Sequence, residues 1–289
     1  MKPFDYFVAH SLDEALGLLG RYSPDALPIA GGTDLLVRMK RNQVSPRVLV
    51  DIAGIPELHG IEVTEQGLHI GSMVTHAEIV SSPLIRQHAP VLADASASVG
   101  APQTRNLGTI GGNLTSCVPS MDGAPPLLVL EALVTVAQAE GRRQVRLEEF
   151  FVAPRCSILT PEQLLVEVLI PTAHLRKAAG FAKFGRRKAL TLALVNAAAL
   201  AELDETGRRF ARPRLALGAV APTPIRARKA EAFLEGKPVA EEILKQAGVI
   251  ASEEAKPIDD FRASAQFRRE LIKVLTCRVF EKALDGRTH

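Results

Sequence analysis

Ile29-Ala30-Gly31-Gly32-Thr33-Asp34-Leu35-Leu36 is the stretch that decides the fold of this chain. Two adjacent glycines follow a short apolar segment, predicted as a strand over 26–30, and precede a helix predicted over 33–41. Without a Cβ, a glycine lets backbone N–H groups approach an anion closely, and the helix that follows directs its positive end there. The pattern predicts a strand–turn–helix unit with an anion-binding turn.

A second run, Thr109-Ile110-Gly111-Gly112-Asn113-Leu114, has the same form. One Gly-Gly pair is more often simply a tight turn, but two facing turns could supply the many N–H donors that a diphosphate needs. Neither run fits G-x-x-x-x-G-K-[ST] or G-x-G-x-x-G, which disfavours a nucleotide triphosphatase or a Rossmann site. We therefore expect the two pairs to hold one phosphorylated cofactor.

Composition limits the class of protein. The 289 residues suffice for two modest domains, and 47% apolar with 23% charged residues is typical of soluble globular proteins. A net charge of +3 and 4% aromatic residues argue against a nucleic-acid partner. There is neither a signal-peptide core nor an apolar run of the roughly 18 residues that would span a bilayer, so we expect a cytoplasmic protein without an integral membrane segment.

The cysteines and histidines indicate no metal site. Cys117, Cys156 and Cys277 lie far apart in sequence, and an iron–sulfur cluster held by this chain alone would need about four. Thr75-His76-Ala77-Glu78 is predicted to form a capping box at a helix start. His59, His69 and His76 are expected at the surface or at helix caps. No nucleophile–base pair stands out, so no catalytic residue is predicted.

The pattern of strands and helices predicts an α+β fold in two parts. A strand over 47–51 completes a β–turn–α–β beginning, and alternating apolar residues predict a hairpin over 60–71. A loop over 100–107 leads into the second glycine pair. We place a boundary near Pro171–Lys177, giving domains 1–175 and 176–289. The second domain is expected to hold a three-stranded sheet (180–187, 192–203 and 212–220) and helices, the last over 264–284.

Four segments together resemble one known family. Ala30–Leu35 and Arg105–Leu114 are similar to the two flavin-binding signatures of the molybdenum hydroxylase FAD subunits, the medium subunits of aerobic carbon monoxide dehydrogenase and bacterial xanthine dehydrogenase. Phe181–Arg187 and the tail from Phe267 to Leu284 resemble that family's smaller C-terminal domain. The resemblance implies a two-subdomain FAD-binding domain of the vanillyl-alcohol-oxidase-like type, followed by a smaller C-terminal domain.

The resemblance also implies which residues bind FAD. They are Ile29, Ala30, Gly31, Gly32, Thr33, Asp34, Leu35, Thr109, Ile110, Gly111, Gly112, Asn113, Asp122, Leu165 and Lys183. The backbone of the four glycines would contact the pyrophosphate, with flanking hydrogen bonds from Thr33, Asp34, Thr109 and Asn113. Asp122 matches an acid that contacts FAD, although it also reads as a turn aspartate. Leu165 and Lys183 match positions near the flavin and its entrance, and Lys183 also reads as a solvated lysine.

The function implied is electron transfer within a complex. In the family that the chain resembles, a molybdopterin-binding large subunit hydroxylates the substrate and a small subunit carries two [2Fe–2S] clusters. Electrons reach FAD on the medium subunit and leave to an external electron acceptor: NAD, a quinone or oxygen. Two alternatives stay open, a stand-alone FAD-dependent oxidase and an assembly or scaffold protein without flavin.

Overall fold

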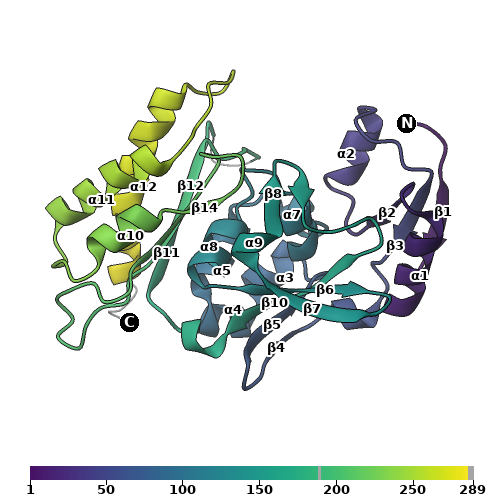
Figure 1. Cartoon of the computed structure of the whole chain (residues 1–289), viewed down its shortest axis with the longest axis horizontal. Helices are drawn as coiled ribbons and strands as arrows, with labels where there is room; N and C mark the ends of the chain where they lie inside the picture. Colours follow the sequence, from purple (N-terminus) through teal and green to yellow (C-terminus); the bar gives the residue numbers. More distant parts are fainter. Residues whose placement is uncertain (188–189, 286–289) are drawn as a thin grey trace.

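The computed structural model describes residues 1–187 and 190–285, and its elements form three groups along the chain (Figure 1). The first group comprises β1 (Asp5–Val8), α1 (Leu12–Tyr22), β2 (Ala26–Ile29), α2 (Leu35–Lys40) and β3 (Val48–Asp51). β1 and β2 pair in parallel with β3, which lies between them. The predicted β–turn–α–β beginning is confirmed, but α2 is shorter than predicted because residues 33 and 34 belong to the turn.

The second group is built on a five-stranded antiparallel sheet of order β4-β5-β10-β6-β7. Its strands are β4 (Ile61–Val63), β5 (Gly67–Gly71), β6 (Leu133–Gln138), β7 (Gly141–Arg146) and β10 (Leu164–Pro171). Its helices are α3 (His76–Ser81), α4 (Pro83–His88), α5 (Pro90–Ala97), α6 (Pro102–Arg105), α7 (Ile110–Thr115), α8 (Ala124–Val129) and α9 (Leu147–Phe150). A small hairpin, β8 (Phe151–Ala153) and β9 (Cys156–Ser157), and two 3₁₀ turns, η1 (Pro56–Leu58) and η2 (Thr172–His174), complete the group. The predicted hairpin over 60–71 is confirmed as β4–β5, whereas the loop predicted over 100–107 contains α6.

The third group is a sheet covered by helices. Its elements are β11 (Ala179–Phe184), β12 (Val195–Leu200), β13 (Arg214–Gly218), β14 (Ile225–Arg226), α10 (Arg228–Leu234), α11 (Glu241–Glu254) and α12 (Ala265–Asp285). The prediction of three strands is wrong, because β14 adds a fourth strand at the edge of the sheet. A two-residue strand directly before a helix is too short to show an alternating pattern in sequence. The last four residues of the expected second domain, 286–289, lie outside the described residues.

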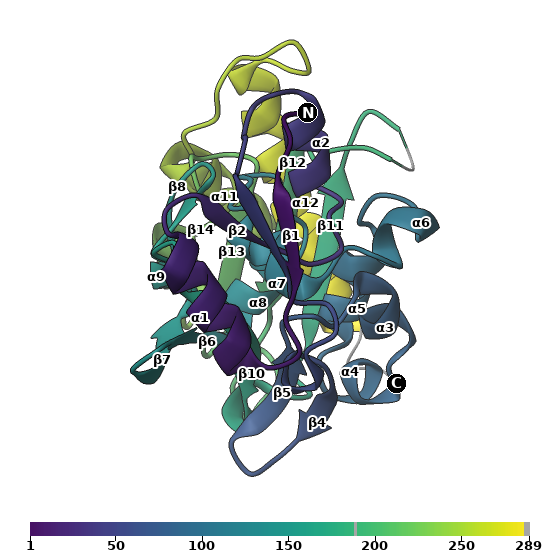
Figure 2. The ribbon, with the colours of Figure 1, turned by 90° about the vertical axis from the view of Figure 1, so that its right-hand side faces the viewer.

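The sheet of the third group is covered on both faces (Figures 1 and 2). α5 and α8 of the second group contact β11, β12 and β13, and α12 contacts β11 and β12 from the other side. Phe181, Leu200 and Ala216 of this sheet belong to the same apolar cluster as α8 and β10. Because burial of apolar surface drives association, this shared core holds the second and third groups in one fixed arrangement.

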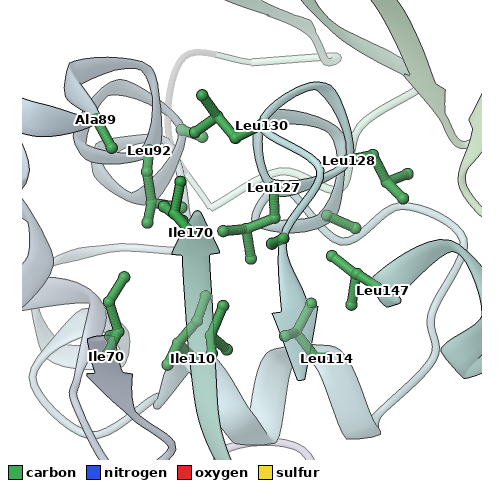
Figure 3. Packing of buried hydrophobic residues seen from close by; sticks show 14 of the residues in the cluster. Ile70, Ala89, Leu92, Ile110, Leu114, Leu127, Leu128, Leu130, Leu147 and Ile170 are labelled. Carbon is green, nitrogen blue, oxygen red and sulfur yellow. The ribbon is translucent and has the colours of Figure 1, made fainter. Parts of the chain in front are cut away.

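α7 is anchored in this core by its apolar face. Ile110 and Leu114, one turn apart on the helix, are fully buried among Ile70, Leu127 and Ile170 (Figure 3). The Thr109 hydroxyl accepts a hydrogen bond from the Gly112 N–H at 3.0 Å and so caps the helix. The first turn of α7 therefore presents its glycines at a defined position.

Candidate functional site

The loop from Gly31 to Leu35, between β2 and α2, is an anion-binding loop in its geometry. Gly32 has a φ of +67°, in the left-handed region that favours glycine. The backbone N–H groups of residues 31–35 donate no hydrogen bond to any other part of residues 1–187 and 190–285. Five consecutive free donors beside a helix start are the arrangement that binds phosphate oxygens in many proteins.

The second glycine pair differs from the first. The expectation of a second turn is wrong, because Gly111 and Gly112 form the first turn of α7. The Gly111 N–H donates to the Ser72 carbonyl at 2.9 Å, and the Gly112 N–H is used by the Thr109 cap. Since both N–H groups already have partners, the second pair offers no free donors. Its lack of side chains still lets a ligand approach the backbone closely.

The two runs nevertheless lie side by side. A Cβ added to Gly31 would lie 1.6 Å from the Leu107 carbonyl oxygen, and one added to Gly108 would lie 3.5 Å from the Thr33 hydroxyl. The two glycine runs, which are more than 70 residues apart in sequence, therefore lie next to each other in the structure, as the sequence predicted.

A cleft of about 530 Å³ opens between these runs. Its size falls in the range of roughly 300–1,000 Å³ that is usual for pockets that bind cofactors and other small ligands. Of the residues predicted to bind FAD, the structure places on its wall Ala30, Gly31, Gly32, Thr33, Asp34, Leu35, Thr109, Gly111, Gly112, Asn113, Asp122 and Leu165. Ile29 and Ile110 instead point into apolar clusters, and Lys183 is not among the lining residues.

Asp34 takes part in ion pairs at the edge of the cleft. Its carboxylate accepts a hydrogen bond from Arg155 at 2.6 Å and lies 4.0 Å from Arg38. It makes no side-chain hydrogen bond that would cap α2. Asp34 therefore ties the glycine loop to the β8–β9 hairpin, and the guanidinium of Arg38 contributes a positive charge to the cleft wall.

Asp122 and Lys183 form a buried ion pair between the second and third groups. The Lys183 Nζ lies 2.5 Å from one carboxylate oxygen of Asp122 and also donates to the Ser98 carbonyl at 3.0 Å. The Asn196 amide donates to the other oxygen at 2.7 Å. Burial raises the pKa of the Asp122 carboxyl, while the Lys183 ammonium acts in the opposite direction. Lys183 thus positions Asp122 at the cleft, and its interpretation as a solvated lysine is wrong.

A third loop on the cleft wall was not found from the sequence. Ser72 and His76, at the β5–α3 connection, line the cleft, and the two residues are 3% and 1% exposed. The predicted capping box of Thr75 and Glu78 is confirmed, but the expectation of a surface or capping histidine is wrong for His76. The signal in the sequence was the position of His76 itself, the first residue of a helix that starts next to a buried strand. Leu190 and Leu192 of the third group also line the cleft.

His76 is held in its neutral form. Burial and the nearby charge of Arg105 lower its pKa to about 4. Its Nδ1 is 3.1 Å from the Ser96 hydroxyl, and Nε2 has no hydrogen-bond partner among the described residues. At neutral pH the ring therefore presents an uncharged nitrogen.

We expect His76 to make folding depend on pH. In the unfolded chain its pKa is about 6.5, so between pH 6.5 and 4 the unfolded state binds the additional proton and stability is lost as the pH falls. Relative to His76→Gln, the wild-type free energy of unfolding should fall by about 2 kcal/mol from pH 7 to pH 5. Urea unfolding at several pH values measures this difference, and parallel curves for the two proteins would contradict it.

Models of known families match both parts of the chain. Residues 2–173 match the "FAD binding domain in molybdopterin dehydrogenase", and residues 180–283 match the "CO dehydrogenase flavoprotein C-terminal domain". The chain belongs to this flavoprotein family. The predicted α+β class, the FAD-binding domain followed by a C-terminal flavoprotein domain, and membership among the FAD subunits of the molybdenum hydroxylases are thereby confirmed.

Relatives of this flavoprotein match it over almost their whole length. The nicotinate dehydrogenase FAD-subunit of Eubacterium barkeri is 33% identical, covering 99% of this chain and 97% of that protein. The xanthine dehydrogenase FAD-binding subunit of Escherichia coli O157:H7 is 33% identical, covering 96% and 95%. In the solved structure of carbon monoxide dehydrogenase from Hydrogenophaga pseudoflava, one chain is similar with a TM-score of 0.94 and 31% identity, covering 99% and 98%.

The flavoprotein shows no feature of a membrane span or of a metal centre in the part that the structure describes. None of its described helices combines the length and apolarity needed to cross a bilayer. Within residues 1–187 and 190–285, no three His, Cys, Asp or Glu side chains come together as metal ligands.

Proposed function

We propose that this flavoprotein binds FAD in the cleft, with the pyrophosphate at the five free N–H groups of residues 31–35. The fit rests on the donor set: those amides have no acceptor among the described residues, and Arg38 adds a positive charge on the same wall. Ile29 and Ala30 lead the chain into the loop, Thr33 and Asp34 flank it, and Leu35 starts α2. Thr109 and Ile110 position the first turn of α7, where Gly111 and Gly112 allow close approach.

We further propose that the flavin ring lies toward the third group. The cleft wall there consists of Asp122 and the apolar side chains Leu190 and Leu192, while Leu165 closes the wall on β10. Asp122, held from both sides by Lys183 and Asn196, gives this end a hydrogen-bonding group of fixed orientation. We propose that the boundary between the two domains, 1–175 and 176–289, lies between residues 175 and 176.

The proposed role is electron transfer in a cytoplasmic complex. Bound FAD can accept electrons singly or in pairs, which is the chemistry that lets it link iron–sulfur clusters to a two-electron acceptor. The residues of this chain bind the cofactor, orient it and restrict water around it. The partners proposed are a molybdopterin-binding large subunit, a small subunit with [2Fe–2S] clusters, and an external acceptor (NAD, a quinone or oxygen).

One observation supports placing the substrate on a partner. Proteins named for nicotinate and xanthine dehydrogenases match this chain at the same 33% identity over nearly the full length. A chain that is matched over nearly its full length by proteins named for such different substrates is more simply explained by a shared role in electron transfer than by recognition of one substrate. The stand-alone oxidase is therefore the weaker alternative, and the flavin-free scaffold would leave the free amides of residues 31–35 without a purpose.

A titration of the purified chain with FAD tests this function. We expect one FAD per chain, with quenched flavin fluorescence, and no turnover of nicotinate, xanthine or carbon monoxide by the chain alone. Adding a reduced [2Fe–2S] partner subunit should bleach the visible absorbance of the flavin, as expected when the flavin is reduced. A chain that takes up no FAD contradicts the proposal, and substrate turnover without partners would favour the stand-alone oxidase.

A further inference from the structure

Glu131 stands at a helix end where glycine is the favoured residue. It follows the C-cap of α8 and has a φ of +49°, in the left-handed region. Its N–H donates to the Leu128 carbonyl at 3.1 Å, and the Ala132 N–H donates to the Leu127 carbonyl at 2.9 Å, the two hydrogen bonds of a Schellman motif. A residue with a Cβ is strained in this conformation, which points to a role for the glutamate side chain.

The Glu131 carboxylate is the centre of an ion-pair network outside the cleft. Its Oε1 lies 3.1 Å from the Nε of Arg214 on β13 and 3.6 Å from the Nη1 of Arg226 on β14. Its Oε2 lies 3.1 Å from the Nε2 of His174. His174 ends η2, in the segment that links β10 to β11 and so joins the second group to the third. The network therefore connects α8, the sheet of the third group and the link between the groups.

The partners of His174 fix its tautomer. Its Nδ1 is 3.0 Å from the Arg214 Nη1, and a guanidinium can only donate, so Nδ1 accepts this hydrogen bond. Nε2 then carries the proton and donates to Glu131. A second proton, on Nδ1, would remove the hydrogen bond from Arg214. Burial and the charge of Arg214 lower the pKa of His174, and the Glu131 carboxylate acts in the opposite direction. The ring is therefore neutral at pH 7.

The other charges around the ring also matter for its protonation. Lys177 lowers the pKa of His174, and Glu202 acts in the opposite direction. On the side of α4, the Arg176 N–H donates to the His88 carbonyl at 2.7 Å, and burial lowers the pKa of His88 too. The remaining charged side chains of the network are Arg146 of β7, Glu148 of α9, and Arg228 and Glu231 of α10. The cations named here outnumber the carboxylates, so a proton on His174 adds to an excess of positive charge.

α8 connects this network to the cleft. Asp122, on the cleft wall, lies just before the N-terminus of α8, and Glu131 lies just after its C-terminus. Asp122 is held by β11 and β12, and Glu131 by β13 and β14. All six residues of α8 are buried, and Leu127 and Leu128 project from it into the packed interior (Figure 3). A short, closely packed helix moves as one piece, so a shift at its Glu131 end reaches Asp122.

We propose that Glu131 and His174 form a latch that positions Asp122 through α8, and that protonation of His174 weakens FAD binding from outside the cleft. Neither residue of the latch is among those that line the cleft, so both are positioning residues. This inference rests on the proposed function, which places the flavin ring beside Asp122. The latch acts on the flavin end of the cofactor, whereas the glycine loop holds the diphosphate independently of it.

Glu131→Gly tests the carboxylate. Glycine keeps the left-handed backbone, so the variant should fold. Its dissociation constant for FAD should rise about threefold to tenfold, the range for one lost hydrogen bond. ADP, measured by displacement of FAD, lacks the flavin end, so its constant should stay within twofold of wild type. Asn42→Gly is the matched control, because Asn42 follows α2 with a φ of +56° and the same two Schellman hydrogen bonds. It should bind both ligands as wild type does.

His174→Gln tests the proton. A glutamine amide offers an acceptor and a donor, as the neutral imidazole does, but it takes up no proton. Between pH 7.5 and pH 5, the FAD constant of the wild type should rise about threefold more than that of His174→Gln, since one hydrogen bond is lost only in the wild type. The ADP constants of the two proteins should change in parallel. His88→Gln, which replaces the histidine on α4, should keep the wild-type pH dependence.

A third measurement reads the tautomer directly. The ¹⁵N NMR shifts of the His174 imidazole at pH 7.5 should show a neutral ring with its proton on Nε2. A proton on Nδ1 would overturn the latch, because Arg214 would then have no acceptor on the ring.

The outcomes separate this inference from the proposed function. A wild-type chain that binds no FAD would overturn the proposed function, whatever the variants do. Wild-type FAD affinity in Glu131→Gly would overturn the latch alone. An equal loss of FAD and ADP affinity would also overturn it, because the variant would then be loosened as a whole. The same pH dependence in wild type and His174→Gln would overturn the role of the proton.

Discussion

Gly31→Ala should weaken FAD binding by at least about a hundredfold, the effect of losing several of the phosphate-binding donors together. The added Cβ would lie 1.6 Å from the Leu107 carbonyl oxygen and 2.4 Å from its carbonyl carbon. Both are backbone atoms, so relief requires the two loops to separate. That movement would displace the free amides of residues 31–35 from the wall formed by Thr109 and α7. Fluorescence titration with FAD measures the affinity, and circular dichroism reports whether the variant is folded.

Gly17→Ala is the control for Gly31→Ala. Gly17 lies within α1 with no atom within 4 Å of an added Cβ, so this variant should bind FAD normally and be stabilised by a few tenths to about 1 kcal/mol. Stoichiometric FAD with wild-type affinity in folded Gly31→Ala would show that the pyrophosphate binds elsewhere. Gly112→Ala should have the smaller effect, because its added Cβ would meet one atom, the Thr109 hydroxyl oxygen at 3.0 Å.

Lys183→Met should lower the free energy of unfolding by about 3–5 kcal/mol, the cost of leaving one member of a buried ion pair without its partner. The Asp122 and Lys183 side chains are 7% and 10% exposed, and the pair joins the second and third groups. Without the ammonium, the carboxylate keeps its hydrogen bond from Asn196 but loses the opposite charge. Because Asp122 lines the cleft, FAD affinity should fall as well. Urea unfolding and FAD titration measure the two effects.

Lys245→Met is the matched control for Lys183→Met. It removes an exposed lysine that pairs with Glu241 one turn away on α11, where solvent screens the interaction, so stability should barely change. Combining Asp122→Asn with Lys183→Met should recover part of the lost stability, because no uncompensated charge is then buried. Equal destabilisation by Lys183→Met and Lys245→Met would mean that the buried pair is not a link between the two groups.

Much of the local structure could be predicted from the sequence. The glycine loop after β2, the β4–β5 hairpin and the capping box of α3 each depend on residues that are close together in the chain. The last helix was predicted over 264–284 and spans Ala265–Asp285, because Leu271, Leu275 and Val279 recur one turn apart and are buried. Such signals are local, and local signals are what sequence patterns report.

Other features of the structure could not be predicted from local sequence patterns, because they depend on contacts between distant segments. The second Gly-Gly pair has the sequence of a turn but lies in α7, since the Thr109 cap and the buried Ile110 and Leu114 stabilise a helix there. β14 is two residues long and is a strand because it pairs with β13. The burial of His76 follows from the packing of α3 against α5 and α6, which lie further along the chain and are not part of the local sequence pattern.

The sequence by itself determined the α+β class, the family and the two glycine runs that meet at the cleft. Each of these depends on residues that are adjacent in the chain, such as a Gly-Gly pair and the residues beside it. The tertiary structure alone decided which N–H groups stay free. The N–H groups of Gly111 and Gly112 donate to Ser72 and Thr109, while those of residues 31–35 have no acceptor in the part of the chain that the structure describes. It also decided that Ser72 and His76 join the cleft and that Lys183 holds Asp122. The physical reason is that hydrogen-bond partners and burial depend on segments that are distant in sequence and become neighbours only when the core has packed.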